Sequence, residues 1–123
     1  MARSSQEAAA PFVARCTETG DRIATDTANG VVARYRRRRR LVDTDLEWVS
    51  AEHRAVSEAP ASDDLGDVLR ELDDHFEDGV PLGILAAAMG QQGWTVGDTL
   101  AATHELRMRG ALWEPRADHL RPV

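Results

Sequence analysis

The last stretch of the chain, residues 95–123, restricts the fold most, because it reads as a helix that leads directly into a β-hairpin. Thr95, with Asp98 three residues later, predicts an N-terminal cap, and Gly110 predicts the helix stop. Apolar and small side chains recur between them at helical spacing and define one buried face. That face comprises Val96, Leu100, Thr103 and Leu106.

A β-hairpin is expected after the glycine stop. Residues 111–114 and 119–123 predict two short strands, and the intervening Pro115-Arg116-Ala117-Asp118 has the composition of a turn.

Two further helices are predicted upstream of this unit. Ser62 or Asp63 can cap the first, and Gly79-Val80-Pro81 breaks it, with Pro81 as an early residue of the second. Gly90-Gln91-Gln92-Gly93 ends the second helix. Three helices followed by a hairpin are the order of a winged helix-turn-helix, which we expect over residues 62–123. Its expected core comprises Leu65, Val68, Leu69, Leu72, Phe76, Leu82, Leu85, Met89, Leu100, Leu106, Leu112 and Leu120.

The first half of the chain predicts a separate, smaller ββαβ-like module over residues 11–50. Strands are expected at 11–16, 22–25 and 46–49, and a helix begins near Asp26, capped by Asp26 or Thr25. Residues 1–10 predict a disordered tail, and residues 51–61 predict a linker. The fold class is therefore α+β.

The strongest charge feature is the arginine run at the end of the N-terminal helix. Clustered guanidinium groups offer bidentate contacts to phosphates, which favours nucleic-acid binding. Cations at a helix C-terminus also interact favourably with the helix dipole. The candidate phosphate ligands in this run are Arg34, Arg36, Arg37, Arg38, Arg39 and Arg40.

The expected wing and last helix supply further candidates. Arg116, His119 and Arg121 lie in the hairpin, and Arg107 and Arg109 lie near the end of the last helix. The expected outward face of that helix includes Gly97, Asp98, Ala101, His104, Glu105 and Met108, of which Asp98 and Glu105 oppose phosphate approach.

An uneven charge distribution leaves an alternative for the arginine run. Residues 1–60 hold ten arginines against nine acidic residues, whereas residues 61–123 hold five against twelve. The run can therefore pair with the acidic half of the same chain or with an acidic partner protein. All fifteen basic residues are arginine, which fits a high-GC genome or a salt-adapted proteome.

The sequence gives little support for a catalytic site or a metal-binding site. Cys16 is the single cysteine, and Thr19 stands where the second cysteine of a CxxC pair would be, so we expect no zinc, at most a degenerate zinc-ribbon-like module. A role as a small, half-buried hydrophobic residue suits Cys16 better. No Gly-rich phosphate loop or paired nucleophile and base occurs, so we expect no enzyme, no cofactor and no small-molecule substrate. No apolar run could span a membrane and no signal peptide is evident, which predicts a cytoplasmic location without membrane partners.

One family resemblance rests on the second half of the chain. The pattern is Leu69-x-x-Leu72-x-x-x-Phe76-x-x-Gly79-x-Pro81, followed by Leu106-x-x-x-Gly110-x-Leu112-Trp113-Glu114-Pro115-Arg116-x-Asp118-His119-Leu120-Arg121. It resembles the C-terminal winged-helix domain of archaeal MCM replicative helicases, especially the haloarchaeal ones, over about residues 62–123. The resemblance implies an accessory domain without the helicase core.

Two functions follow. The first is a non-enzymatic DNA-binding accessory or regulatory factor in replication or transcription, with the arginine helix on the phosphates of duplex DNA. The second is a protein–protein adaptor whose winged helix docks a replication or transcription partner.

Overall fold

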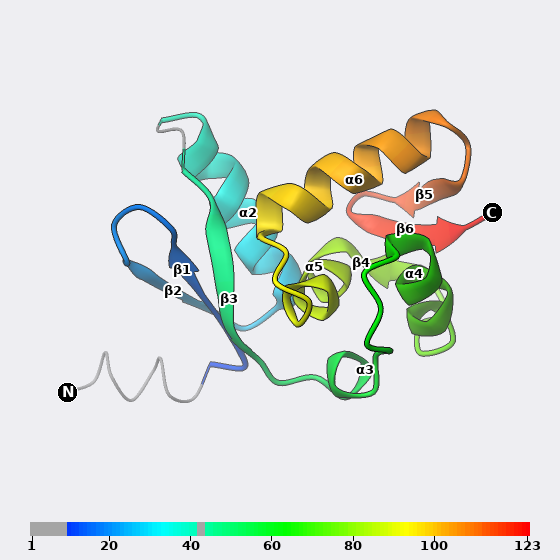
Figure 1. Ribbon diagram of the computed structural model, residues 1–123, viewed down its shortest axis with the longest axis horizontal. Coiled ribbons are helices and arrows are strands. Elements are labelled where there is room, and N and C mark those ends of the chain that lie inside the picture. The colour runs from blue at the N-terminus through cyan, green and yellow to red at the C-terminus, as the bar shows by residue number, and fades with distance from the viewer. Residues whose placement is uncertain (1–9, 42–43) are drawn as a thin grey trace.

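The computed structural model describes residues 10–41 and 44–123, which form an α+β fold with five helices and two three-stranded antiparallel sheets (Figure 1). The predicted disordered tail lies, except for Ala10, outside these described residues. No helix among them is long and apolar enough to cross a membrane.

The first sheet and helix follow the expected ββαβ order. Strands β1 (Phe12–Cys16), β2 (Arg22–Thr25) and β3 (Leu46–Ala51) form a sheet in the order β2-β1-β3. Helix α2 (Ala28–Arg39) lies between β2 and β3 in the chain. Neither Asp26 nor Thr25 caps it, contrary to expectation. Thr27 does, because its extended backbone places the hydroxyl where it accepts from the N–H of Gly30.

The expected linker contains a short helix, α3 (Arg54–Ser57), whose Ala55 and Val56 are buried. Helix α4 (Leu65–Asp73) follows. Its cap is Asp64, one residue later than predicted, and the Asp64 carboxylate accepts from the N–H of Asp67 at 3.1 Å.

The second sheet joins the hairpin to a strand that the sequence pattern did not predict. Strand β4 (Val80–Pro81) precedes α5 (Leu82–Gly90) and α6 (Val96–Met108), and the hairpin strands β5 (Leu112–Arg116) and β6 (His119–Pro122) follow. The sheet order is β4-β6-β5, with Val80 paired to Leu120. Pro81 therefore belongs to a strand and caps α5 instead of starting it.

The hairpin turn is also tighter than predicted. Pro115 and Arg116 continue β5, so the turn itself is Ala117-Asp118. Asp118 has a φ of 60°, a left-handed conformation that aspartate tolerates better than most residues.

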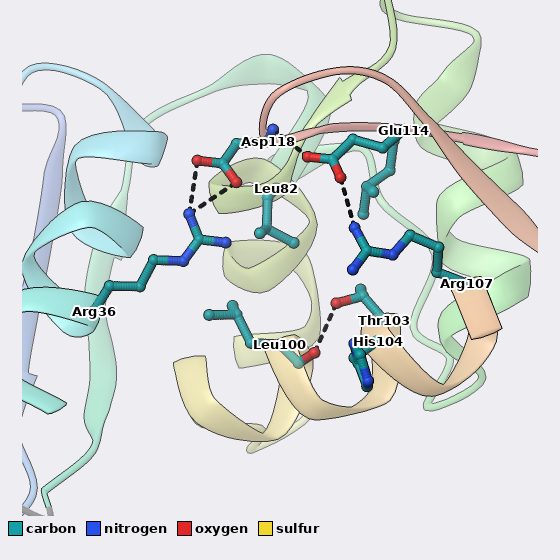
Figure 2. Close-up of a pocket in the computed structure, with 9 residues that line it drawn as sticks. Arg36, Leu82, Leu100, Thr103, His104, Arg107, Glu114 and Asp118 are labelled. Carbon is teal, nitrogen blue, oxygen red and sulfur yellow. Dashed lines mark hydrogen bonds and ion pairs between the residues drawn. The ribbon is translucent and has the colours of Figure 1, made fainter. Parts of the chain in front are cut away.

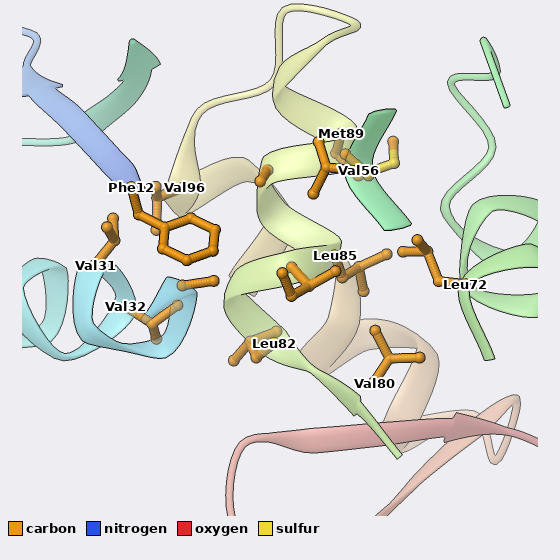
Figure 3. Close-up of a cluster of buried hydrophobic side chains, with 14 of the residues drawn as sticks. Phe12, Val31, Val32, Val56, Leu72, Val80, Leu82, Leu85, Met89 and Val96 are labelled. Atoms are coloured by element: carbon orange, nitrogen blue, oxygen red, sulfur yellow. The ribbon is translucent and has the colours of Figure 1, made fainter. Parts of the chain in front are cut away.

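Helix α5 is the centre of the molecule, and every residue from Leu82 to Met89 is buried. The expected core included only Leu82, Leu85 and Met89 of this helix, but elements from both halves surround it (Figure 3). The side chains around it include Phe12 of β1, Val31 and Val32 of α2, Val56 of α3, Leu72 of α4 and Val96 of α6.

Most of the predicted core is buried, with three exceptions. Phe76, Leu100 and Leu106 are only partly buried and pack against the edge of the core. Phe76 follows the end of α4 and stacks on His53, while Leu100 and Leu106 each border a surface pocket.

The two halves of the chain share this core. Gly83 of α5 lies against the backbone of Ala28 in α2, and Gly90 lies against the indole of Trp48 in β3. The division into modules at residues 51–61 stays a prediction, but the structure packs both sides of it together.

Candidate nucleic-acid interface

The six candidate arginines of α2 and its C-cap, Arg40, have different surroundings. Arg34, Arg37 and Arg40 are exposed, and none has a hydrogen bond or ion pair within the described part of the chain. Arg36 pairs with Asp118, and Arg39 is exposed but already engaged. Arg38 is half-buried, and its buried Nε has no hydrogen-bond partner among the described residues. The run is therefore divided between solvent and the protein itself.

The three unpaired arginines form a row, which we call the arginine row (Arg34, Arg37 and Arg40). A spacing of three residues keeps them on neighbouring positions of one side of the helix. At 1.5 Å per residue, Arg34 and Arg40 are about 9 Å apart along the axis. A DNA strand carries one charge per roughly 3.4 Å of its axis, so the row can face two or three phosphates.

Arg36 connects the helix to the hairpin turn. Its Nη1 donates to both carboxylate oxygens of Asp118 at 2.8 Å. The carbonyl of Asp118 accepts from the side-chain amide of Asn29 at 3.1 Å and from the N–H of Leu82 at 2.8 Å. These contacts hold the turn against α2 and α5. The hairpin tip is therefore docked on the protein.

The EPR-x-DHLR segment forms much of this docking network. Glu114 accepts from Arg107 of α6 at 2.6 Å and from the backbone N–H of Asp118 at 2.6 Å. Arg121 donates to the carbonyl of Glu77 at 2.8 Å and lies 3.4 Å from Asp73. Four residues of this segment, Glu114, Asp118, His119 and Arg121, thus have a structural role in the hairpin or its docking.

His119 contacts the hairpin turn and Arg116 through its two ring nitrogens. Its Nδ1 lies 2.8 Å from the carbonyl of Ala117 and must donate, while its Nε2 lies 3.0 Å from Arg116 and must accept. Arg116 is exposed, so it is the hairpin arginine with most access to a ligand.

The exposed face of α6 agrees with expectation apart from its first turn. Asp98, Ala101, His104, Glu105 and Met108 are exposed, and Arg109 lies 3.5 Å from Glu105. Gly97 is not outward. Asp45, just before β3, covers it, because its carboxylate accepts from the N–H of Gly97 at 2.8 Å and from the hydroxyl of Thr95 at 2.7 Å.

A pocket of about 240 Å³ opens between α2, α5, α6 and the hairpin. Arg36 and Arg107 enter it from opposite sides, and Asp118 and Glu114 lie beside them (Figure 2). Leu82, Leu100 and Leu120 form apolar walls, and Thr103 and His104 complete the lining.

Cys16 is fully buried in the core, with 1% of its surface exposed. Hydrogen bonds from Thr19, with a smaller contribution from Arg38, lower the pKa of its thiol from 9.0 to about 6. Across the described residues, no group of three or more His, Cys, Asp or Glu side chains is placed to hold a metal ion.

Sequence reasoning missed Asp45 and Asn29 as connecting residues. Asn29 Oδ1 accepts from the N–H of Gly83 at 2.7 Å while its Nδ2 reaches Asp118. Asx side chains in helix-start regions are a generic capping signal, so the pattern alone does not reveal partners more than fifty residues away.

Comparison with known protein families gives a match to the second half of the chain. Residues 70–120 match a family model described as the HVO_B0008 C-terminal domain, which covers less than half of the chain. No curated protein and no solved structure matches the chain. The matched span begins in α4 and ends in β6. It contains Glu114 and Asp118 of the hairpin network, but neither Arg36 nor Arg121 and none of the arginine row.

Proposed function

We propose that this protein is a non-enzymatic DNA-binding factor, an accessory or regulatory component in replication or transcription, built on a winged helix. The order α4, β4, α5, α6, β5, β6, with β4 paired to β6, supports the winged-helix assignment. The expected relationship to the archaeal MCM C-terminal domain belongs to the same proposal.

The arginine row is the observation that supports DNA binding most. Three guanidinium groups that point to solvent without a partner keep their full donor capacity for phosphates. Protein–DNA affinity comes largely from such contacts. Arg116 on the hairpin is a further exposed donor.

Phosphate contacts are expected to dominate over base readout. The exposed face of α6 carries Asp98 and Glu105, which repel phosphates near the groove that a recognition helix enters. The docked hairpin tip further limits how far the wing can reach. We therefore expect strong salt dependence and little sequence preference.

The test is a salt-dependent titration of duplex DNA with the full chain and with a variant in which Arg34, Arg37 and Arg40 become Gln. Each lost phosphate contact lowers the slope of log K against log salt by about 0.9. The triple variant should therefore lose up to about 2.7 from the slope.

The matched control changes Arg15, Arg54 and Arg70 to Gln. This removes the same net charge from arginines that are paired with Glu47, Glu58 and Asp67 on other surfaces. Its DNA affinity should stay within about twofold of the wild type. Undetectable binding by the wild type at low salt, or equal weakening of both variants, would contradict the proposal.

A protein-docking function is the second candidate, and exposed apolar side chains favour it. Met108 at the end of α6 is 72% exposed, and Trp113 in β5 is 50% exposed. Methionine and tryptophan are enriched at protein interfaces. If the protein docks a partner in this way, Trp113→Ala would abolish binding to a captured partner protein, whereas the variant with Gln at Arg34, Arg37 and Arg40 would still bind it.

A further inference from the structure

The pocket between α2, α6 and the hairpin has the chemistry of an anion site. Arg36 and Arg107 use only Nη1 in their described hydrogen bonds, to Asp118 and Glu114 respectively. The Nε and Nη2 groups of both side chains have no hydrogen-bond partner within the described residues. Figure 2 shows both guanidinium groups directed into the pocket. Up to six N–H donors therefore remain for a ligand.

The two carboxylates are already engaged. Both oxygens of Asp118 accept from Arg36, while the oxygens of Glu114 accept from Arg107 and from the N–H of Asp118. They hold the guanidinium groups in place and offset their charge. What the pocket has left to offer is mainly hydrogen-bond donors, which suits a ligand rich in acceptor oxygens.

The size of the pocket limits what can enter. Its volume of about 240 Å³ is below the 300–1,000 Å³ typical of sites that enclose a drug-sized molecule. The walls of Leu82, Leu100 and Leu120 narrow it further. A phosphate group fits, whereas a complete nucleotide would leave its sugar and base outside.

We propose that Arg36 and Arg107 together bind one phosphate group in this pocket. Planar guanidinium groups bind phosphate oxygens in a bidentate manner, and two of them from opposite sides surround the group. Either a nucleic-acid backbone or a small phosphate ester can supply it. The phosphate site is independent of the proposed function, and only its nucleic-acid source rests on that function.

The test is a titration of the full chain at low ionic strength with inorganic phosphate and adenosine 5′-monophosphate. Nuclear magnetic resonance of the arginine Nε–H groups follows binding. We expect the Arg36 and Arg107 signals to shift. Arg107→Gln and Arg36→Gln each remove the charge-assisted hydrogen bonds of one guanidinium group to the phosphate. Each variant should therefore bind phosphate about tenfold more weakly, or worse.

The controls are two arginines outside both proposed binding sites. Arg109→Gln removes a charge from the same end of α6, where the side chain pairs with Glu105 outside the pocket. Arg15→Gln removes a charge from β1, where the side chain pairs with Glu47 and does not line the pocket. Both should bind phosphate within about twofold of the wild type. Circular dichroism melting identifies any variant that fails to fold. Because Arg36 and Arg107 lie on different helices, the test still gives an answer if one of the two variants does not fold.

Duplex DNA titrated against the same variants separates the two sources. If Arg107→Gln weakens both phosphate and DNA binding, the pocket holds a backbone phosphate. If it weakens phosphate binding alone, the pocket holds a small phosphate ester. If the protein binds phosphate but not DNA, the result supports the phosphate site and contradicts the proposed DNA-binding function. The proposed phosphate site would be wrong if the Arg36 and Arg107 signals did not shift at tens of millimolar phosphate. It would also be wrong if the control variants bound phosphate as weakly as Arg36→Gln and Arg107→Gln.

Discussion

Gly83, in the first turn of α5, lies against Ala28 in the first turn of α2. A Cβ at position 83 would overlap the carbonyl carbon and oxygen of Ala28, which are backbone atoms and cannot rotate away. Asn29 bonds the Gly83 N–H at the same point, so the approach is held by a hydrogen bond as well as by packing.

We predict that Gly83→Ala destabilises the protein by more than about 3 kcal/mol, because the two helices must separate. Gly66→Ala, inside α4, is the control. Its Cβ would meet only side-chain atoms, and alanine favours a helix by about 1 kcal/mol, so its stability should change by no more than that. Chemical denaturation measures both. A small effect of Gly83→Ala would contradict the backbone contact.

Cys16 gives a pH-dependent prediction at the same scale. Since Thr19 lowers the pKa of its thiol to about 6 in the folded protein, the folded state binds fewer protons than the unfolded state between about pH 6 and 9. The thiolate therefore contributes stability that is fully present above pH 9 and is lost as the pH falls to 6.

The measurement compares the wild type with Cys16→Ala by denaturation under reducing conditions at pH 6, 7, 8 and 9. The stability difference between the two proteins should shrink steadily as the pH falls. A difference that stays constant over this range would mean that the thiol of Cys16 titrates near its ordinary value.

At the scale of elements, the start of α6 depends on a residue from the other half of the chain. Thr95 and Asp98 form the capping box that the sequence predicts. Asp45 adds to it by accepting from the hydroxyl of Thr95, and from the N–H groups of Gly97 and Leu46 at 2.8 and 2.7 Å. One carboxylate thus joins the start of β3 to the start of α6.

We predict that Asp45→Ala costs about 2 kcal/mol of stability, because three donors that are buried or half-buried lose their acceptor together. Asp63→Ala removes an exposed carboxylate with no hydrogen bond among the described residues and should change stability by less than about 0.5 kcal/mol. Urea denaturation of both variants provides the comparison. Equal effects would show that Asp45 contributes no more than surface charge.

On the scale of the whole molecule, α5 is surrounded by both halves of the chain. The predicted modules would each bury a small core, but the structure has a cluster in which Phe12, Val31 and Leu46 join Leu72, Leu85 and Met89. Removing the first half would expose the side of α5 that packs against it, and α5 is buried all around in the intact protein. Such a core favours cooperative unfolding.

We therefore predict a single unfolding transition. Variants that retain only Trp48, in the first half, or only Trp94, in the second, with phenylalanine at the other tryptophan positions, report on each half. In each variant the fluorescence midpoint should coincide with the midpoint from far-ultraviolet circular dichroism. Two separated transitions would instead support the predicted module boundary at residues 51–61.

Local patterns predicted much of the secondary structure for a physical reason. The periodicity of Leu65, Val68, Leu69 and Leu72 specifies a helix from neighbours alone, and the box of Thr95 and Asp98 specifies where the last helix begins. Strand β4 was not predicted because its two residues are too few to show a periodic pattern. The hairpin turn was misplaced because Pro115 and Arg116 have turn composition but pair as strand.

By itself the sequence determined the order of the four longer helices and of five of the six strands. It also determined the large share of apolar residues in α5 and the clustering of arginine at the end of α2. These properties depend on residues close together in the chain. Only the tertiary structure decided that Arg36 meets Asp118, eighty-two positions away, while Arg34, Arg37 and Arg40 remain open to solvent. Which charges are neutralised depends on what packs beside them, and that is decided by the fold.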